Sequence, residues 1–333
     1  MAHAIALFSG GLDSSLSILG LLRLGVKVTA IHFETSFGCL PVAIKAGLRS
    51  LADQYGFEFI TQDIKAEFLE VLKKPTFGYG KNMNPCIDCK IMMLQKAGEV
   101  MRQRGADCVV TGEVLGQRPM SQQRHIFNLM EKRTGLKGYI LRPLSALKLP
   151  PTIVETKGLI DRNRLYGFTG RSRKPQMALA KELGLSNYPA PAGGCLLTEP
   201  NYAKRLKELL SHNPEPTPND IAILKFGRHF RLPEGNKVVI GRDQADNEGL
   251  RGFIGHETTV LEPVGVKGPL TLIIGKDVSK EGISIAATLC ARYSDGRTLS
   301  EVEVSVTRNG CVVDTLSVNP SDAEAYRAFM IGV

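Results

Sequence analysis

A glycine turn between an apolar strand and a helix, close to the start of the chain, constrains the fold more than any other feature of the sequence. The run 4–8 (AIALF) predicts a buried strand, and apolar residues of helical period follow from Leu16 to Leu24. The segment between them is Ser9-Gly10-Gly11-Leu12-Asp13-Ser14-Ser15. Strand, turn and helix together predict one βα unit of an α/β fold.

The chemistry of this turn favours a bound anion. It presents backbone N–H groups at a helix N-terminus, where the helix dipole attracts negative charge. Its two glycines let the backbone approach a phosphate without a Cβ clash, and its three serines add hydroxyl donors. Asp13 would repel a bare phosphate, so its presence indicates a bridging Mg²⁺. We therefore predict a phosphate-binding loop.

Strands and helices alternate along the rest of the first half. The expected strands are 26–33, 57–61, 108–111 and 139–141, and the expected helices are 41–55 and 88–103. This alternation predicts an α/β fold, a parallel sheet with helices on both faces. Ligands of such sheets gather at the carboxyl ends of the strands. Both the glycine turn and Thr111-Gly112-Glu113 fall at such ends.

The length of 333 residues favours two domains. We expect residues 1–210 to form the first domain and 211–220 a linker, because that segment carries three prolines and no apolar residue. Residues 221–333 are expected to form a C-terminal α+β domain. Its expected strands are 221–226, 237–240, 258–261, 270–274, 301–307 and 311–318, with a helix at 282–293.

Composition narrows the class of protein. No run approaches 18 apolar residues, so we expect no membrane span, and the N-terminus reads as a strand rather than a cleavable signal. We expect a cytoplasmic protein, in which seven cysteines favour metal or thiol chemistry over disulfides. A net charge of +9 favours a polyanionic partner such as RNA.

Three cysteines are candidates for chemistry. Cys86 and Cys89 lie three residues apart just before a helix, where a thiol pKa is expected to fall, and Cys195 follows two glycines in an open turn. Three cysteines can hold three irons of a [4Fe–4S] cluster and leave the last iron open to a sulfide. Two alternatives remain open. Cys195 could carry a persulfide that Cys89 resolves, or the cysteines could bind zinc with His125 or an outside group as fourth ligand.

The other four cysteines carry weaker signals. Cys108 lies in an apolar strand and Cys290 on the apolar face of a helix, so both are expected in the core. Cys39 and Cys311 have no evident role, and we expect Cys39 to be structural.

These motifs resemble a known family. The SGGLDS loop is similar to that of the PP-loop ATP pyrophosphatases, and with 111–117 (TGEVLGQ) and 141–144 (LRPL) it resembles the tRNA 4-thiouridine synthases. The segment 84–89 (NPCIDC) is also similar to the bacterial tRNA 2-thiouridylases, and the three candidate cysteines to the ligands of iron–sulfur-dependent tRNA thiolation enzymes. Neither the THUMP domain nor the rhodanese domain of the usual 4-thiouridine synthases is recognised in the sequence.

The resemblance implies roles for individual residues. Asp13, Cys89 and Cys195 are the expected catalytic residues, and Cys86, Cys89 and Cys195 the expected metal ligands. The expected nucleotide-binding residues are Ser9, Gly10, Gly11, Asp13, Ser14, Ser15, His32, Phe33, Thr111, Gly112 and Gln117. ATP, Mg²⁺ and a [4Fe–4S] cluster are the implied cofactors.

A basic segment predicts an RNA surface. Residues 156–175 hold six Lys or Arg against one acid, with Tyr166 and Phe168 interleaved as stacking or packing groups. The expected RNA contacts are Arg162, Arg164, Arg171, Arg173 and Lys174. Segments 239–247 (VIGRDQADN) and 286–294 (AATLCARYS) resemble the RNA-binding module of NFACT-type proteins. The alternative for this C-terminal domain is a structural or oligomerisation role.

Together these features predict a tRNA uridine thiolase that adenylates a uridine carbonyl oxygen and then replaces it with sulfur, most simply as 4-thiouridine. The sulfur would come from sulfide or from a donor such as a cysteine desulfurase. The alternatives are a tRNA 2-thiouridylase, a PP-loop ligase or amidase with a zinc site, and a non-catalytic RNA-binding protein.

Overall fold

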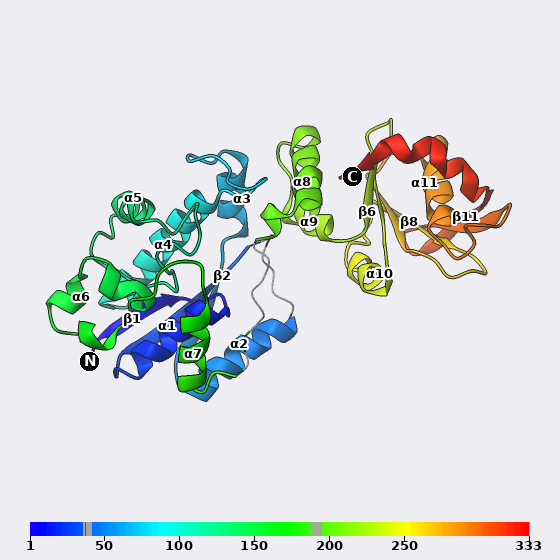
Figure 1. Cartoon of the computed structure of the whole chain (residues 1–333). Coiled ribbons are helices and arrows are strands. Elements are labelled where there is room, and N and C mark those ends of the chain that lie inside the picture. The colour runs from blue at the N-terminus through cyan, green and yellow to red at the C-terminus, as the bar shows by residue number, and fades with distance from the viewer. Residues whose placement is uncertain (36, 38–41, 187, 189–194, 333) are drawn as a thin grey trace. The chain divides into compact units, whose positions relative to one another are not determined.

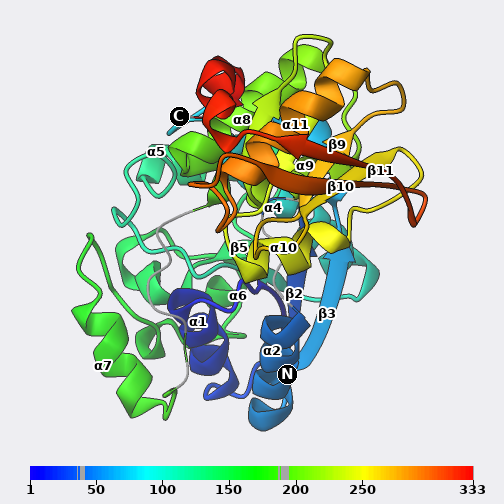
Figure 2. The ribbon, with the colours of Figure 1, turned by 90° about the vertical axis from the view of Figure 1, so that its right-hand side faces the viewer.

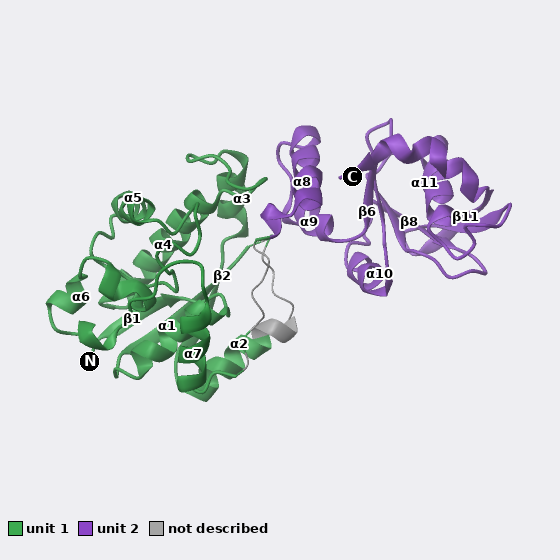
Figure 3. Ribbon diagram, in the orientation of Figure 1, with its two compact units in different colours: residues 1–195 green, residues 196–333 purple. Residues whose placement is uncertain are grey.

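The computed structural model describes residues 1–35, 37, 42–186, 188 and 195–332. They form two compact units, Met1–Cys195 and Leu196–Val333 (Figure 3). The division lies earlier than the expected linker, because helix α8 (Pro200–His212) packs within the second unit. There Arg205 donates a hydrogen bond to the carbonyl of Leu224 at 3.1 Å, and Glu208 pairs with Arg231 at 2.7 Å.

The first unit is built on a five-stranded parallel sheet of order β3-β2-β1-β4-β5 (Figure 1). Its strands are β1 (His3–Leu7), β2 (Lys27–Glu34), β3 (Glu58–Asp63), β4 (Cys108–Val110) and β5 (Ile140–Leu141). All four pairings are parallel, which confirms the predicted sheet. Because β1 pairs with β2 on one side and with β4 on the other, the strand order reverses at β1. The carboxyl ends of β1 and β4 therefore flank the point where such sheets bind ligands.

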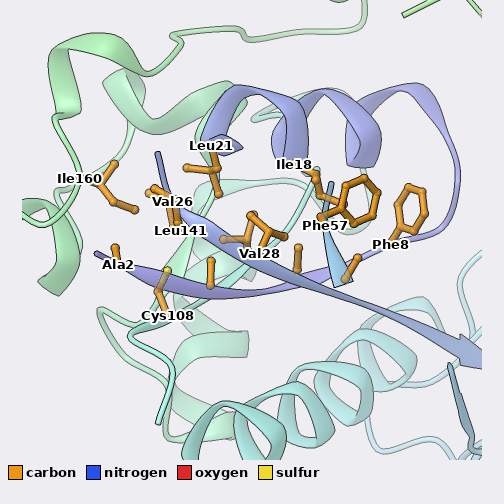
Figure 4. Packing of buried hydrophobic residues seen from close by; sticks show 14 of the residues in the cluster. Ala2, Phe8, Ile18, Leu21, Val26, Val28, Phe57, Cys108, Leu141 and Ile160 are labelled. Carbon is orange, nitrogen blue, oxygen red and sulfur yellow. The ribbon is translucent and has the colours of Figure 1, made fainter. Parts of the chain in front are cut away.

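Helices cover both faces of this sheet, as predicted. Figure 4 shows α1 (Leu12–Leu22) on one face, where Ile18 and Leu21 join Val28, Cys108 and Leu141 in one buried cluster. Helix α4 (Cys86–Gln103) packs on β1 and β4 from the other face. The remaining elements of this unit are α2 (Val42–Tyr55), α3 (Lys65–Lys73), α5 (Arg124–Thr134), η1 (Pro143–Lys148), α6 (Ile153–Thr156), η2 (Arg162–Arg164) and α7 (Lys174–Glu182).

The second unit contains an antiparallel sheet of seven strands in the order β11-β10-β8-β9-β7-β6-β12. The strands are β6 (Arg228–Arg231), β7 (Lys237–Ile240), β8 (Thr258–Pro263), β9 (Thr271–Ile274), β10 (Val302–Arg308), β11 (Cys311–Val318) and β12 (Met330–Ile331). Its helical segments are η3 (Leu196–Thr198), α8, α9 (Pro218–Ala222), η4 (Ile223–Lys225), α10 (Gln244–Arg251), α11 (Lys280–Arg292) and η5 (Pro320–Phe329). Figure 2 gives a second view of these elements. The sheet and helix confirm the predicted α+β class.

Two details of this unit test the sequence predictions. The predicted strands 301–307 and 311–318 correspond to β10 and β11, which a hairpin joins with Asn309 and Gly310 in the left-handed region at φ 48° and 78°. The predicted strand 221–226 is wrong, since this segment is helical in α9 and η4. A capping box between Thr217 and Asp220, with a proline at the first helical position, starts a helix there instead.

Within the described residues, none of the helices is both long enough and apolar enough to cross a membrane.

Candidate nucleotide and thiol site

The predicted phosphate loop joins β1 to α1. Gly10 is buried at φ +75°, where a Cβ would lie 2.3 Å from a methyl carbon of Leu48. The hydroxyls of Ser14 and Ser15 donate to the carbonyl of Gly11 at 2.9 and 3.1 Å. No side chain caps the N-terminus of α1. The first amides of the helix therefore remain available to an anion.

A second loop, residues 111–117, follows β4 and packs directly on the first. A Cβ on Gly112 would lie 2.5 Å from the amide nitrogen of Ser14 and 2.6 Å from the carbonyl carbon of Asp13. Gln117 donates through Nε2 to Oδ2 of Asp13 at 3.0 Å. The structure thus brings Gly112 and Gln117 to Asp13, which lies about a hundred residues earlier in the sequence. The contact lies where the strand order of the sheet reverses.

Gly112→Ala is expected to destabilise the first unit by about 1–3 kcal/mol, because the new methyl group meets backbone that cannot rotate away. Urea unfolding monitored by circular dichroism would measure this effect. Gly47→Ala is the matched control, since a Cβ at this helical position in α2 meets nothing within 4 Å. Equal stability of the two variants would contradict the backbone contact.

An ion-pair network ties the second loop to helix α4. The Glu113 carboxylate pairs with Lys90 of α4 and accepts a bond from Nε of Arg142 at 3.2 Å. Arg142 is buried over the ring of Phe127, 3.9 Å from its centroid. Burial alone would raise the pKa of Glu113, but the charges and hydrogen bonds of Lys90 and Arg142 together hold that pKa below its ordinary value. Glu113 is therefore an anion that locks the two elements together.

Lys90, Glu113 and Arg142 were not predicted from the sequence to belong to the site. Two signals were available. Lys90 directly follows Cys89, and Glu113 lies inside the TGEVLGQ segment. Only the fold reveals that these two positions, with Arg142 of the LRPL segment, share one carboxylate.

Cys86 and Cys89 lie one turn apart at the start of α4. This helix begins two residues earlier than the predicted helix 88–103. Asp88, between the two cysteines, accepts hydrogen bonds from the amides of Thr76 and Phe77, both at 3.0 Å, so the preceding loop is fixed to this turn. Burial raises the pKa of the Cys89 thiol above its ordinary value, and the neighbouring Cys86 and Cys195 raise it further. The lowered pKa expected from the helix N-terminus is thus wrong for Cys89, because desolvation and neighbouring thiols outweigh the dipole.

Cys195 is exposed and is the last residue of the first unit, and its thiol is one of the groups that raise the pKa of Cys89. Three thiols fit an iron–sulfur cluster in kind and number. Among the residues that the structure describes, however, no group of three or more His, Cys, Asp or Glu side chains is gathered closely enough to hold a metal ion. In the part of the chain that the structure describes, the side chains therefore do not form a closed ligand set for the cluster or for the zinc alternative with His125. Cys39 and the glycines before Cys195 lie outside the described residues.

Cys108 and Cys290 are buried in the cores of the two units, as predicted. Burial raises the pKa of each thiol to about 12. Cys311 is exposed on β11.

His32 and Phe33 end β2 beside the phosphate loop, and both are buried. The Nδ1–H of His32 donates to the carbonyl of Phe8 at 2.9 Å, which fixes the tautomer and makes Nε2 an acceptor. Nε2 is buried and has no hydrogen-bond partner in the described part of the chain. An unsatisfied acceptor at the carboxyl end of a central strand is a suitable partner for a ligand N–H or O–H group.

The predicted RNA contacts separate into three kinds. Arg162 pairs with Glu155 at 2.5 Å and donates to the carbonyls of Ala146 and Leu149 at 2.7 Å, so its guanidinium is used within the fold. Arg171 and Lys174 are exposed, and Arg164 makes one long bond to a carbonyl. Arg173 lies against Asp13, 3.7 Å from Oδ2.

The interleaved aromatic residues pack inward. Tyr166 and Phe168 stack on each other at 5.3 Å and join the cluster that covers α1. They are therefore packing groups, one of the two roles considered from the sequence.

In the second unit, the residues of the VIGRDQADN segment hold the fold together. Asp246 accepts hydrogen bonds from the amide of Gly227 at 3.0 Å and from Arg242, and Asp243 caps helix α10. Asn247 accepts a bond from the amide of Leu270 at 3.0 Å.

A glycine loop without lysine at the reversal point of a parallel sheet, with a second loop packed on it, defines a nucleotide-binding α/β domain of the PP-loop type. Residues 1–157 match the family described as thiamine biosynthesis protein (ThiI), and residues 227–330 match the family described as NFACT protein RNA binding domain. The larger part of the first unit thus resembles a ThiI-type PP-loop domain, and most of the second unit resembles an NFACT-type RNA-binding domain. Both resemblances predicted from the sequence are confirmed.

Individual relatives cover parts of the chain. A probable tRNA sulfurtransferase of Thermococcus kodakarensis is 29% identical over 113 residues, 34% of this chain and 30% of that protein. This chain therefore spans less than a third of that relative's length. The tRNA-specific 2-thiouridylase MnmA of Herpetosiphon aurantiacus is 26% identical over 264 residues, 70% of this chain and 67% of that protein. A solved tRNA thiolase, NcsA of Methanococcus maripaludis with its [4Fe–4S] cluster, is 16% identical with a TM-score of 0.34, covering 67% of this chain and 70% of that one.

Proposed function

We propose that this protein is an ATP-dependent tRNA sulfurtransferase that replaces a uridine carbonyl oxygen with sulfur. One observation carries the proposal. The loop that packs on the predicted phosphate site through Gly112 is bound, through Glu113 and Lys90, to the turn that bears Cys86 and Cys89. These contacts connect the predicted phosphate loop to the turn that bears two of the three candidate thiols, which supports one site for ATP and sulfur. The sulfurtransferase relative supports the reaction class.

The nucleotide half of the site activates the uridine. A carbonyl oxygen is a poor leaving group, and attack of that oxygen on the α-phosphorus of ATP converts it into an adenylate while pyrophosphate leaves. The amides of Gly11 and the following turn, with the hydroxyls of Ser9, Ser14 and Ser15, would bind the pyrophosphate. Asp13 would hold Mg²⁺, and Nε2 of His32 would accept a hydrogen bond from the adenosine, with Phe33 beside it. Thr111 and Gln117 would close the site from the second loop.

The thiol half supplies sulfur. Cys86, Cys89 and Cys195 would hold a [4Fe–4S] cluster, which when bound offers an iron without a protein ligand as a site for sulfide. AMP departs once sulfur has attacked. We propose 4-thiouridine as the product, with 2-thiouridine as the second candidate because the longest match reported above is to a 2-thiouridylase.

Purified protein with ATP and unmodified tRNA tests the reaction class. The proposal expects AMP and pyrophosphate only when tRNA is present, and mass spectrometry of the nucleosides then distinguishes 4-thiouridine from 2-thiouridine. AMP formation that requires ammonia and leaves tRNA free of sulfur would favour a PP-loop ligase. Binding of tRNA without any turnover would favour a non-catalytic RNA-binding protein.

The exposed cations Arg171 and Lys174 are proposed tRNA contacts. Replacing both with Ala is expected to weaken tRNA binding and to reduce the salt slope of log K by about 1–2, because fewer counterions are released. Filter binding at several salt concentrations measures both quantities. Lys181→Ala, which removes an exposed cation from the far end of α7, is the control. An unchanged affinity and slope would move the RNA surface to the NFACT-type domain.

A further inference from the structure

Asp13 has an unusual set of neighbours for a residue in a phosphate loop. Its Oδ2 accepts a bond from Gln117 at 3.0 Å and lies 3.7 Å from Nη2 of Arg173. Its Oδ1 is buried and has no hydrogen-bond partner in the described part of the chain. Arg173 therefore balances the negative charge of the loop from the position immediately before helix α7.

Helices α1 and α7 pack against each other. At one end Asp13 of the first turn of α1 lies against Arg173, and at the other end Arg23 pairs with Glu182, the last residue of α7. Leu16 and Leu19 of α1 share a buried cluster with Leu179 and Ala180 of α7. The two ion pairs and this seam fix the start of α7 beside the phosphate loop.

The N-terminus of α1 and the guanidinium of Arg173 thus meet at the same loop. A helix N-terminus carries a partial positive charge, and a guanidinium binds phosphate oxygens through paired N–H groups. The segment before α7 is held in place as well, because the amide of Gly170 donates to the carbonyl of Leu115 at 2.8 Å. Arg173 is half-buried, whereas its neighbours Arg171 and Lys174 are exposed.

We propose that Arg173 is a phosphate ligand of the nucleotide site, which balances Asp13 in the empty protein and contacts the phosphates of bound ATP. This inference rests on the ATP site of the proposed function, and it removes Arg173 from the tRNA surface predicted from the sequence. A guanidinium already held at the loop loses little side-chain freedom when a phosphate arrives, so its bonds to the ligand are strong.

The test measures binding by the full-length chain with isothermal titration calorimetry, using Mg²⁺–ATP and inorganic pyrophosphate as probes. Arg173→Ala is expected to weaken both by about tenfold or more, the usual effect of losing a charge-assisted hydrogen bond. Arg173→Lys is expected to restore part of the affinity, because the charge remains but the paired donors are lost. Lys181→Ala, which removes an exposed cation from the other end of α7, is the control and is expected to leave both affinities unchanged.

A second comparison separates a ligand from a residue that only neutralises Asp13. In an Asp13→Asn background there is no carboxylate to balance. If Arg173 contacts phosphate, adding Arg173→Ala still weakens binding of metal-free pyrophosphate. If Arg173 only balances Asp13, adding Arg173→Ala leaves pyrophosphate binding in the Asp13→Asn background unchanged, and the proposal is overturned.

Two further outcomes separate this proposal from the proposed function. Wild-type protein that binds Mg²⁺–ATP, loses that binding in Arg173→Ala and yet never thiolates tRNA would uphold the phosphate ligand and reject the sulfurtransferase. Unchanged ATP binding in Arg173→Ala, with weakened tRNA binding, would return Arg173 to the RNA surface. Wild-type protein that binds neither ATP nor pyrophosphate would overturn both.

Discussion

Asp13→Ala is expected to lower tRNA-dependent formation of AMP and pyrophosphate by roughly a hundredfold or more, the usual loss when a charge that organises the reacting phosphates is removed. Asp13 is the acid of the phosphate loop, and its Oδ1 is buried without a partner in the described part of the chain, so it has capacity for a metal ligand bond. The substitution also removes the acceptor for Gln117. A coupled assay for pyrophosphate, with AMP quantified by chromatography, measures the effect.

The fold should survive this change, because Asp13 is partly exposed and its partners lie at the surface of the loop. Circular dichroism and the urea midpoint check this point. Asp53→Ala, which removes an exposed carboxylate from α2, is the matched control and should turn over normally. Normal turnover in Asp13→Ala itself would reject the assignment of a PP-loop active site.

Replacing any one of Cys86, Cys89 and Cys195 with Ala is expected to abolish cluster absorbance in the visible region and tRNA thiolation together. Three ligands hold three irons, so the loss of one leaves the cluster without a stable site. Binding of Mg²⁺–ATP should persist, because the phosphate loop is a separate element between β1 and α1. Iron and acid-labile sulfide in anaerobically purified protein, with spectra before and after reconstitution, provide the measurement.

The other cysteines supply the controls. Cys311→Ala, on the exposed face of β11, should change neither cluster nor stability. Cys108→Ala and Cys290→Ala should affect stability alone, since each thiol is buried in the hydrophobic core of its own unit. A cluster and full activity retained in Cys195→Ala would contradict the three-ligand arrangement. Loss of thiolation in that variant, in a protein that contains no iron, would favour a persulfide on Cys195 that Cys89 resolves.

Much of the first unit could be predicted because local and global signals agree there. The run 4–8 before the glycine turn is apolar, and a helical pattern follows the turn directly. β2 and β4 are also mostly apolar and buried, as strands of a covered parallel sheet are. The parallel sheet and its ligand-binding edge follow from the alternation of strands and helices.

The second unit was harder to predict because short apolar segments suit a strand or a helix equally well. The segment 221–226 has the residues of a strand, but the Thr217 capping box just upstream commits it to a helix. The prolines of 211–220 indicated a linker, yet one of them is the first residue of α9. A proline at that position begins a helix as readily as it ends one.

Within the site, the sequence identified motifs but not their partners. The Arg and Lys residues from 162 to 174 predict one basic surface. In the structure, however, Arg162 donates to two backbone carbonyls and pairs with Glu155, and Arg173 lies against Asp13. The pKa of Cys89 was predicted in the wrong direction because the helix dipole is visible in the sequence and burial is not. Long-range contacts decide both cases.

The bond between Lys90 and Glu113 has a consequence for how the substrate must behave. It holds the first turn of α4, with the thiols of that turn, against the loop that packs on the phosphate site. In the proposed reaction, thiols held in this position require the RNA to deform instead. The target uridine would leave its stack and enter the protein, and the cost of unstacking would favour nucleotides that are already loosely held in the folded tRNA.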